Sequence, residues 1–162
     1  MLVLLLAFAV TVADQWTKQM VRDGFHYGEI RPIISGFFNL TYIRNTGAAW
    51  GLFGGRNNGL VLLSVLMLGA LVAFRRSFLT HCLSHRIALG CMVGGMVGNL
   101  MDRVRLGYVV DFLDFHWGAR HFPAFNIADS AICIGVGIYI ISSFLAERAS
   151  RVKAADGDAG AA

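Results

Sequence analysis

Long apolar runs separated by short polar segments dominate the pattern along this chain. A transmembrane helix needs about 20 predominantly apolar residues. Four stretches approach that length, at about 1–21, 58–74, 86–103 and 126–147. Residues 37–43 read FFNLTYI, and such aromatic and β-branched sequence is typical of a strand. The pattern predicts an all-α membrane protein, a single domain over 1–150 with four transmembrane helices and a small extracytoplasmic β-sheet.

The composition agrees with this membrane assignment. Of the 162 residues, 56% are hydrophobic and only 15% are charged, whereas an ordinary soluble domain has roughly 45–50% apolar and about 25% charged residues. So few charges cannot coat so much apolar mass. The net charge is +4, but the 14 basic residues form no dense patch, so we expect no nucleic-acid partner. The chain is therefore expected to be an integral membrane protein.

The basic residues predict the orientation. The short loop over 75–86 holds Arg75, Arg76 and Arg86 and no acidic residue, and more basic residues follow the last apolar run. Short loops rich in Lys and Arg stay in the cytoplasm, so both termini are expected to be cytoplasmic. Residues 151–162 read as a disordered cytoplasmic tail.

A few polar residues interrupt the apolar runs at positions where they are costly. An ionisable group at the centre of a membrane helix costs at least about 2.5–3.5 kcal/mol, so it usually faces the bundle interior and has a function. With four spans, the polar residues of the first, third and fourth runs all reach the same depth, near the outer face. They are Asp14, Asn99, Asp102, Arg103, Asn126 and Asp129.

The third apolar run carries a stripe of small residues. Gly90, Gly94 and Gly98 recur every four residues, which lets another helix approach closely. Asp102 continues the stripe and is therefore expected to point into the bundle. Beside Arg103 it is open to two interpretations, a structural ion pair or direct chemistry.

The start of the fourth run suggests acid–base chemistry. Asn126 and Asp129 are three residues apart, the spacing of an N-cap and an N3 residue. A second carboxylate close to Asp129 would raise the pKa of one member of the pair. Two carboxylates that share a proton are the arrangement of an aspartic protease. Spacing alone does not choose the partner among Asp102, Asp111 and Asp114.

Other polar pairs have simpler interpretations. Asp14 and Lys18 are spaced i, i+4 and could pair on one helix face. His116 and His121 are five residues apart, which fits no strong zinc pattern. We therefore expect neither a metal site nor a cofactor.

Five short motifs together resemble a known family. They are DQWTK at 14–18, NTGAAW at 45–50, GGMVGNLMDR at 94–103, VVDF at 109–112 and FNIADS at 125–130. In this order and spacing they are similar to the bacterial lipoprotein signal peptidases, also called signal peptidase II, over nearly the whole chain.

The resemblance implies an aspartyl endopeptidase of the bacterial cytoplasmic (inner) membrane, with its active site near the outer face. Such enzymes remove the signal peptide of prolipoproteins whose cysteine carries a diacylglyceryl group, and cut just before that cysteine. The family's catalytic pair corresponds to Asp111 and Asp129. Its supporting residues correspond to Asp14, Asn45, Asn99, Asp102, Arg103 and Asn126.

The resemblance also assigns roles and partners. Asn99, Arg103 and Asn126 would hold the substrate backbone, while Asp14 and Asp102 would support the site. The strand segment would form a surface cradle and 103–125 a mobile lid. The implied partners are diacylglyceryl prolipoproteins, membrane lipids and globomycin-type inhibitors, and a monomer suffices.

Two functions of other classes compete with this interpretation. A transporter or proton channel would need polar residues through the full depth of the bilayer, but the inner halves of the runs are nearly all apolar. A structural subunit would not explain why the polar clusters meet at one depth.

Overall fold

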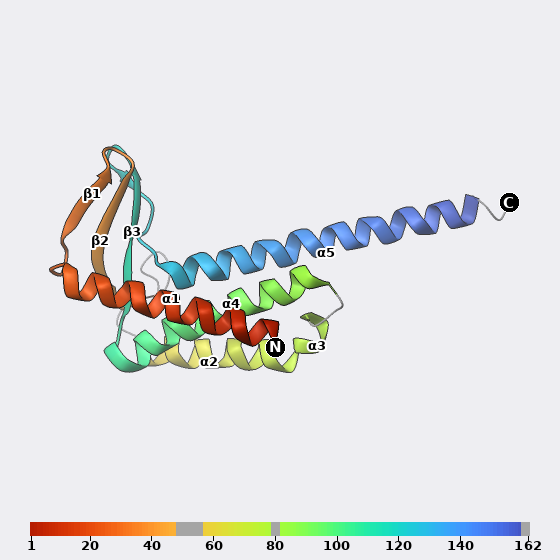
Figure 1. Ribbon diagram of the computed structural model, residues 1–162, viewed down its shortest axis with the longest axis horizontal. Helices are drawn as coiled ribbons and strands as arrows, with labels where there is room; N and C mark the ends of the chain where they lie inside the picture. Colours follow the sequence, from red (N-terminus) through yellow and green to blue (C-terminus); the bar gives the residue numbers. More distant parts are fainter. Residues whose placement is uncertain (48–56, 79–81, 160–162) are drawn as a thin grey trace.

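The computed structural model describes residues 1–47, 57–78 and 82–159. Helices lie side by side, and a small sheet stands at one end of them (Figure 1). In chain order the elements are α1 (Leu2–Gly24), β1 (Ile30–Ile34), β2 (Phe38–Asn45), α2 (Asn57–Ala73), α3 (Arg75–Phe78), α4 (Leu83–Leu106), β3 (Val109–Trp117), β4 (Arg120–His121) and α5 (Ile127–Ala159). The predicted bounds of the first three long helices lie within about one turn of those observed.

Helix α4 packs against α1 through its glycine stripe. A Cβ atom added at Gly94 would lie 2.7 Å from the carbonyl oxygen of Ala7, and one added at Gly90 would lie 2.8 Å from Cβ of Leu6. Both neighbours belong to α1, so a side chain at either glycine would push the two helices apart. The prediction that this stripe admits a close helix neighbour is confirmed.

Glycines also bring α4 and α5 together. A Cβ atom at Gly135 of α5 would lie 2.7 Å from the carbonyl oxygen of Ala88 in α4. A Cβ atom at Gly95 of α4 would likewise collide with the backbone of Ala128 in α5. The backbone of α4 thus packs directly against the backbones of α1 and α5, and these contacts fix where the ends of the three helices lie.

Two helices of the described chain are long and apolar enough to cross a membrane. They are Leu83–Leu106 and the part of α5 over Ile127–Arg151. Helix α2 is apolar but shorter, and α1 carries Asp14, Lys18 and Arg22 in its second half. Two of the four predicted spans therefore meet this criterion, and the other two stay predictions.

The outer faces of the helices are apolar. Leu4 and Phe8 of α1 are 74% and 71% exposed, and Leu62, Leu66 and Ile141 on α2 and α5 are also exposed. Soluble monomers rarely expose apolar patches of this extent. An exposed apolar surface of this extent is typical of contact with a membrane or with another protein.

The sheet has the order β1-β2-β3-β4, with antiparallel neighbours. Strand β2 confirms the strand predicted at 37–43. Strand β3 falls within 103–125, the segment expected to be a lid, and instead pairs with β2, so that Ile43 lies opposite Asp111 and Asn45 opposite Val109. The sequence of β3 is rich in β-branched and aromatic residues, which suits a strand. Its partner strand β2 lies far away in the chain, so the local sequence does not show which strand β3 pairs with.

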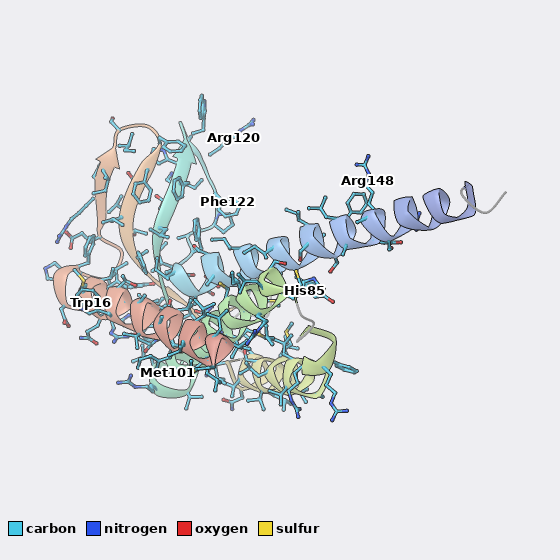
Figure 2. All side chains as sticks on the ribbon, turned by 45° about the vertical axis from the view of Figure 1, so that its right-hand side comes forward. Trp16, His85, Met101, Arg120, Phe122 and Arg148 are labelled. Atoms are coloured by element: carbon cyan, nitrogen blue, oxygen red, sulfur yellow. The ribbon has the colours of Figure 1, made fainter. Side chains whose placement is uncertain are left out.

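Helix α5 is longer than the predicted 126–147. It continues to Ala159, so residues 151–159, predicted to be disordered, are helical. Alanine, glutamate, arginine and lysine, all strong helix formers, dominate the sequence from 146 to 155, and Glu147 pairs with Arg151 one turn later at 2.6 Å. Figure 2 shows Arg148 on the part of α5 that projects beyond the other helices.

Candidate active site

The polar residues that were expected at one depth lie together at the sheet end of the helices. The second half of α1, the last turns of α4 and the first turn of α5 meet there with β2 and β3 (Figure 1). The side chains of Asp14, Asn45, Asn99, Asp102, Asp111, Asn126 and Asp129 join one network of hydrogen bonds and ion pairs.

Asn126 lies at the centre of this network. Its side-chain Nδ2 donates to Oδ1 of Asp111 at 2.7 Å and to the carbonyl oxygen of Val110 at 3.2 Å. Its Oδ1 accepts from the backbone N–H of Asp129 at 3.0 Å, and its own N–H donates to Oδ2 of Asp129 at 3.3 Å. These reciprocal bonds form a capping box at the start of α5, which confirms the predicted N-cap and N3 positions. One residue therefore holds both carboxylates.

Asp111 is buried on β3, with 2% of its surface exposed. Its Oδ2 accepts from Nδ2 of Asn45 at 2.8 Å, which explains why the end of β2 belongs to the site. Burial raises the pKa of Asp111 to about 7, and the nearby charge of Asp129 adds to the rise; hydrogen bonds from Asn45 and Asn126 and the charge of Lys18 oppose it. Near neutral pH this carboxyl can therefore be a proton donor.

Asp129 receives a different set of contacts. Its Oδ1 accepts from Nδ2 of Asn99 in α4 at 2.7 Å, while Asn126 donates to Oδ2. Its position in the first turn of α5 also favours negative charge, because the helix dipole is positive there. The arrangement around Asp129 suits a carboxylate that accepts a proton.

Lys18 belongs to the polar network of the site, although it was not among the site residues predicted from the sequence. Its ammonium, 0% exposed, lies 2.9 Å from Oδ2 of Asp14 and 3.1 Å from Oδ2 of Asp102. It also donates to Oδ1 of Asn99 at 2.8 Å. The predicted pair of Asp14 and Lys18 is confirmed. The contacts of Lys18 with Asp102 and Asn99 were not predicted. The signal for them in the sequence is a lysine inside an apolar run, one turn after an aspartate.

Asp102 takes Lys18, not Arg103, as its cation. Adjacent residues point about 100° apart on a helix, and Asp102 faces α1, where Gln15 donates to its Oδ1 at 2.9 Å. Its Oδ2 accepts from the backbone N–H of Val110 at 3.1 Å. Asp102 therefore ties α1, α4 and β3 together, and the ion pair with Arg103 that the sequence left open is not the one formed.

Asp14 connects the first helix of the chain to the last. Its Oδ1 accepts from the backbone N–H of Ala128 at 2.9 Å, in the first turn of α5. The first N–H groups of a helix lack partners within it, so this carboxylate satisfies one of them across the bundle. Asp14 thereby places the turn that carries Asp129.

A cleft of about 930 Å³ opens beside the two carboxylates. Polar side chains of Asn45, Asn99 and Arg103 line one part of it. Apolar side chains line another part, and Figure 2 shows one of them, Phe122, near the first turns of α5. These apolar residues are Phe122, Pro123, Phe125 and Ile132. The cleft can hold an extended peptide with an apolar group beside it.

Arg103 lines the cleft and makes few contacts with the described residues around it. Its Nη2 makes only a long contact of 3.4 Å with the carbonyl oxygen of Gly47. Its Nε is buried and has no partner among the residues that the structure describes. A guanidinium with unused donors can bind a carbonyl group of a ligand in the cleft.

Asp114 lies outside this site. It accepts from Asn39 at 2.8 Å and contacts His121 at 2.8 Å. Burial raises its pKa, but the hydrogen bonds from His121 and Asn39 outweigh burial and hold that pKa below its ordinary value. Among the three partners that spacing left open for Asp129, the one that lines the cleft with it is Asp111.

Comparison with known proteins identifies relatives of this chain. Residues 6–145 match the family described as signal peptidase (SPase) II. A lipoprotein signal peptidase of Shewanella loihica is 45% identical over 143 residues, which cover 86% of this chain and 84% of the relative. One of Syntrophotalea carbinolica is 40% identical over 146 residues, which cover 88% and 91%.

Solved structures agree with this result. A bacterial membrane enzyme determined by the in meso method at 2.3 Å resolution superimposes with a TM-score of 0.81 and 37% identity, over 88% of this chain and 87% of that one. A second bacterial membrane enzyme, at 1.9 Å, gives a TM-score of 0.77 and 38% identity over 86% and 90%. The chain therefore belongs to the signal peptidase II family of proteases, which remove signal peptides from lipoproteins.

Proposed function

We propose that this chain is an aspartic endopeptidase in which Asp111 and Asp129 activate a water molecule. The observation that carries this proposal is that both carboxylates line one cleft and that Asn126 bonds to both. A pair with one proton between them can supply a base and an acid to the same peptide bond. Neither a metal nor a cofactor takes part in this scheme.

The two aspartates have different roles at the start of the reaction. Asp129 is the general base, because its contacts with Asn99 and Asn126 and the helix dipole favour its ionised form. Asp111 is the acid, since its pKa of about 7 keeps about half of it protonated at pH 7 and most of it protonated below that pH. Asp129 takes a proton from the water as it attacks the carbonyl carbon, and Asp111 protonates the carbonyl oxygen. As the tetrahedral intermediate collapses and the C–N bond breaks, the proton on Asp129 passes to the leaving amine, and Asp111 takes a proton back from one hydroxyl of the intermediate, which restores the starting state of both carboxyl groups.

Asn99 and Asn126 hold the catalytic pair in this scheme. Each uses its side-chain amide on carboxylates and neighbouring groups of the site. Arg103 has donors to spare and is the residue that binds a substrate carbonyl. Asp14 and Asp102 support the site through the contacts with Lys18.

The substrate is a prolipoprotein whose cysteine carries a diacylglyceryl group, cut just before that cysteine. The apolar part of the cleft receives the start of the lipid, and the acyl chains stay in the bilayer. The chain crosses the bacterial inner membrane four times with both termini in the cytoplasm, which puts the sheet and the cleft at the outer face. Globomycin-type inhibitors compete for the same cleft, and a monomer carries out the reaction.

A cleavage assay on the purified chain tests this proposal. We expect it to cut a diacylglyceryl-modified prolipoprotein before the modified cysteine, as read by mass spectrometry of both products. Globomycin should inhibit the reaction, and a chelator should not change it. Equal cleavage of the unmodified precursor would contradict the assigned substrate, and loss of activity with the chelator would contradict the aspartic mechanism.

The pKa of Asp111 predicts how the rate depends on pH. Because the acid form of this carboxyl is required and its pKa is about 7, kcat should fall as the pH rises above about 7. The fall should approach tenfold per pH unit, as for loss of one required proton. Steady-state rates between pH 5 and 9 measure this, with the melting temperature recorded at each pH to show that the protein stays folded. A rate that stays constant up to pH 9 would exclude Asp111 as the acid.

A further inference from the structure

We propose that Lys18 is a positioning residue for the catalytic pair: its ammonium group fixes the orientation of the Asn99 amide and thereby holds Asp129 as the base. This inference deepens the proposed function and rests on it. It concerns a side chain that does not line the cleft and therefore acts through Asn99.

The hydrogen bonds of Asn99 show how this works. Its Oδ1 accepts from Nζ of Lys18 at 2.8 Å and from Nδ2 of Asn126 at 3.2 Å, and its Nδ2 donates to Asp129 at 2.7 Å. An ammonium group has donors and no acceptor. If the amide turned over, its NH₂ would face the ammonium and its oxygen would face the carboxylate of Asp129. Lys18 therefore excludes the orientation that would repel an ionised Asp129.

Two carboxylates aim the ammonium at Asn99. Asp14 and Asp102 lie 2.9 and 3.1 Å from Nζ, and both are buried, as is Lys18. The ammonium has three N–H donors, so two bind these carboxylates and the third remains for Asn99. The third contact extends this ion cluster to the catalytic pair.

The charge of Lys18 also acts on Asp111. This buried cation lowers the pKa of Asp111, against the rise caused by burial and by Asp129. Within the described residues, the other charged groups near the pair include Asp14 from α1 and Asp102 and Arg103 from α4. Because Lys18 is shielded from water, salt in the buffer screens its effect little.

Replacement of Lys18 with methionine tests this inference, since methionine is apolar and of similar length. We expect kcat to fall about 10²- to 10³-fold, the cost of losing one preorganised polar contact in an active site. KM should change little because Lys18 does not line the cleft. The alkaline limb of the pH–rate profile should move to higher pH, because Asp111 loses the cation that favoured its ionisation.

Two further variants separate positioning from folding. Lys18→Met leaves two buried carboxylates without their cation, so a double variant, Lys18→Met with Asp14→Asn, removes one of these charges and keeps an oxygen for the N–H of Ala128. It should fold and still show the low kcat, with a pH profile that shifts in the same direction but by less than in Lys18→Met, because a negative charge is removed together with the positive one. The control is Thr11→Val, which removes a hydrogen bond of 3.0 Å from α1 to the carbonyl oxygen of Gly94 in α4. It should keep the wild-type pH profile.

The results distinguish failure of this inference from failure of the proposed function. A folded Lys18 variant, single or double, with the wild-type kcat and pH profile would overturn the positioning role, provided that Asp111→Asn is inactive in the same assay. A wild-type pH profile with a kcat that falls only in proportion to the folded fraction would overturn it too. Activity in Asp111→Asn would instead refute the catalytic pair on which the inference rests.

Discussion

Replacement of either Asp111 or Asp129 with asparagine is expected to lower kcat for lipoprotein cleavage by about 10⁴-fold, at the upper end of what general acid–base groups contribute. An asparagine at 111 cannot give up a proton to the carbonyl oxygen, and one at 129 cannot accept a proton from water. Single-turnover assays with excess enzyme measure the residual rate, and circular dichroism in detergent verifies that each variant is folded.

The matched control for this prediction is Asp114→Asn. Asp114 is also a buried carboxylate of β3, but it accepts from Asn39 and contacts His121 and does not line the cleft. Its variant should cleave within a few-fold of the wild-type rate. If Asp111→Asn kept a rate similar to that of Asp114→Asn, the assignment of the catalytic pair would be wrong.

The second large effect concerns the contact of α4 with α5. Gly135→Ala is expected to destabilise the protein by about 1–3 kcal/mol, the usual cost of adding atoms to a closely packed site. The new methyl group would lie 2.7 Å from the carbonyl oxygen of Ala88 and 2.8 Å from Cγ of Met92. The backbone oxygen cannot move aside as a side chain can, so the helices must separate. Unfolding by denaturant in mixed micelles measures the change.

Gly137→Ala is the control on the same helix. A Cβ atom at Gly137 has no neighbour within 4 Å, and alanine favours the helix over glycine by about 0.5–1 kcal/mol. This variant should be slightly more stable than the wild type. If both variants lost the same stability, the close contact between α4 and α5 at Gly135 would not be the cause, and the effect would come from the change in backbone freedom that both substitutions share.

The apolar pattern predicted the long helices well, because a run of about 20 apolar residues is typical of a helix long enough to cross a membrane. The glycine spacing in α4 likewise predicted a close helix neighbour, which is α1. The end of α5 was predicted less well, since glycine and aspartate near residue 156 looked like a tail while the helix continues to Ala159.

The site was harder to predict where it depends on contacts between distant segments. Spacing within one helix correctly paired Lys18 with Asp14, but Asp102 and Asn99 reach the same ammonium from α4. The family resemblance assigned 103–125 to a lid, and the sequence alone did not show that β3 within it pairs with β2, more than 60 residues earlier in the chain. The contact between Asn45 and Asp111 follows from that pairing, so no local pattern could reveal it.

The bond from the N–H of Ala128 to Asp14 has a consequence for the biogenesis of the enzyme. A membrane protein is synthesised from its N-terminus, so α1 is present long before α5. The first turn of α5 carries Asp129, and its full set of contacts forms only when this last helix docks against α1 and α4. Under the proposed mechanism, proteolytic activity therefore requires the completed assembly, and a chain whose last helix has not docked would be inactive.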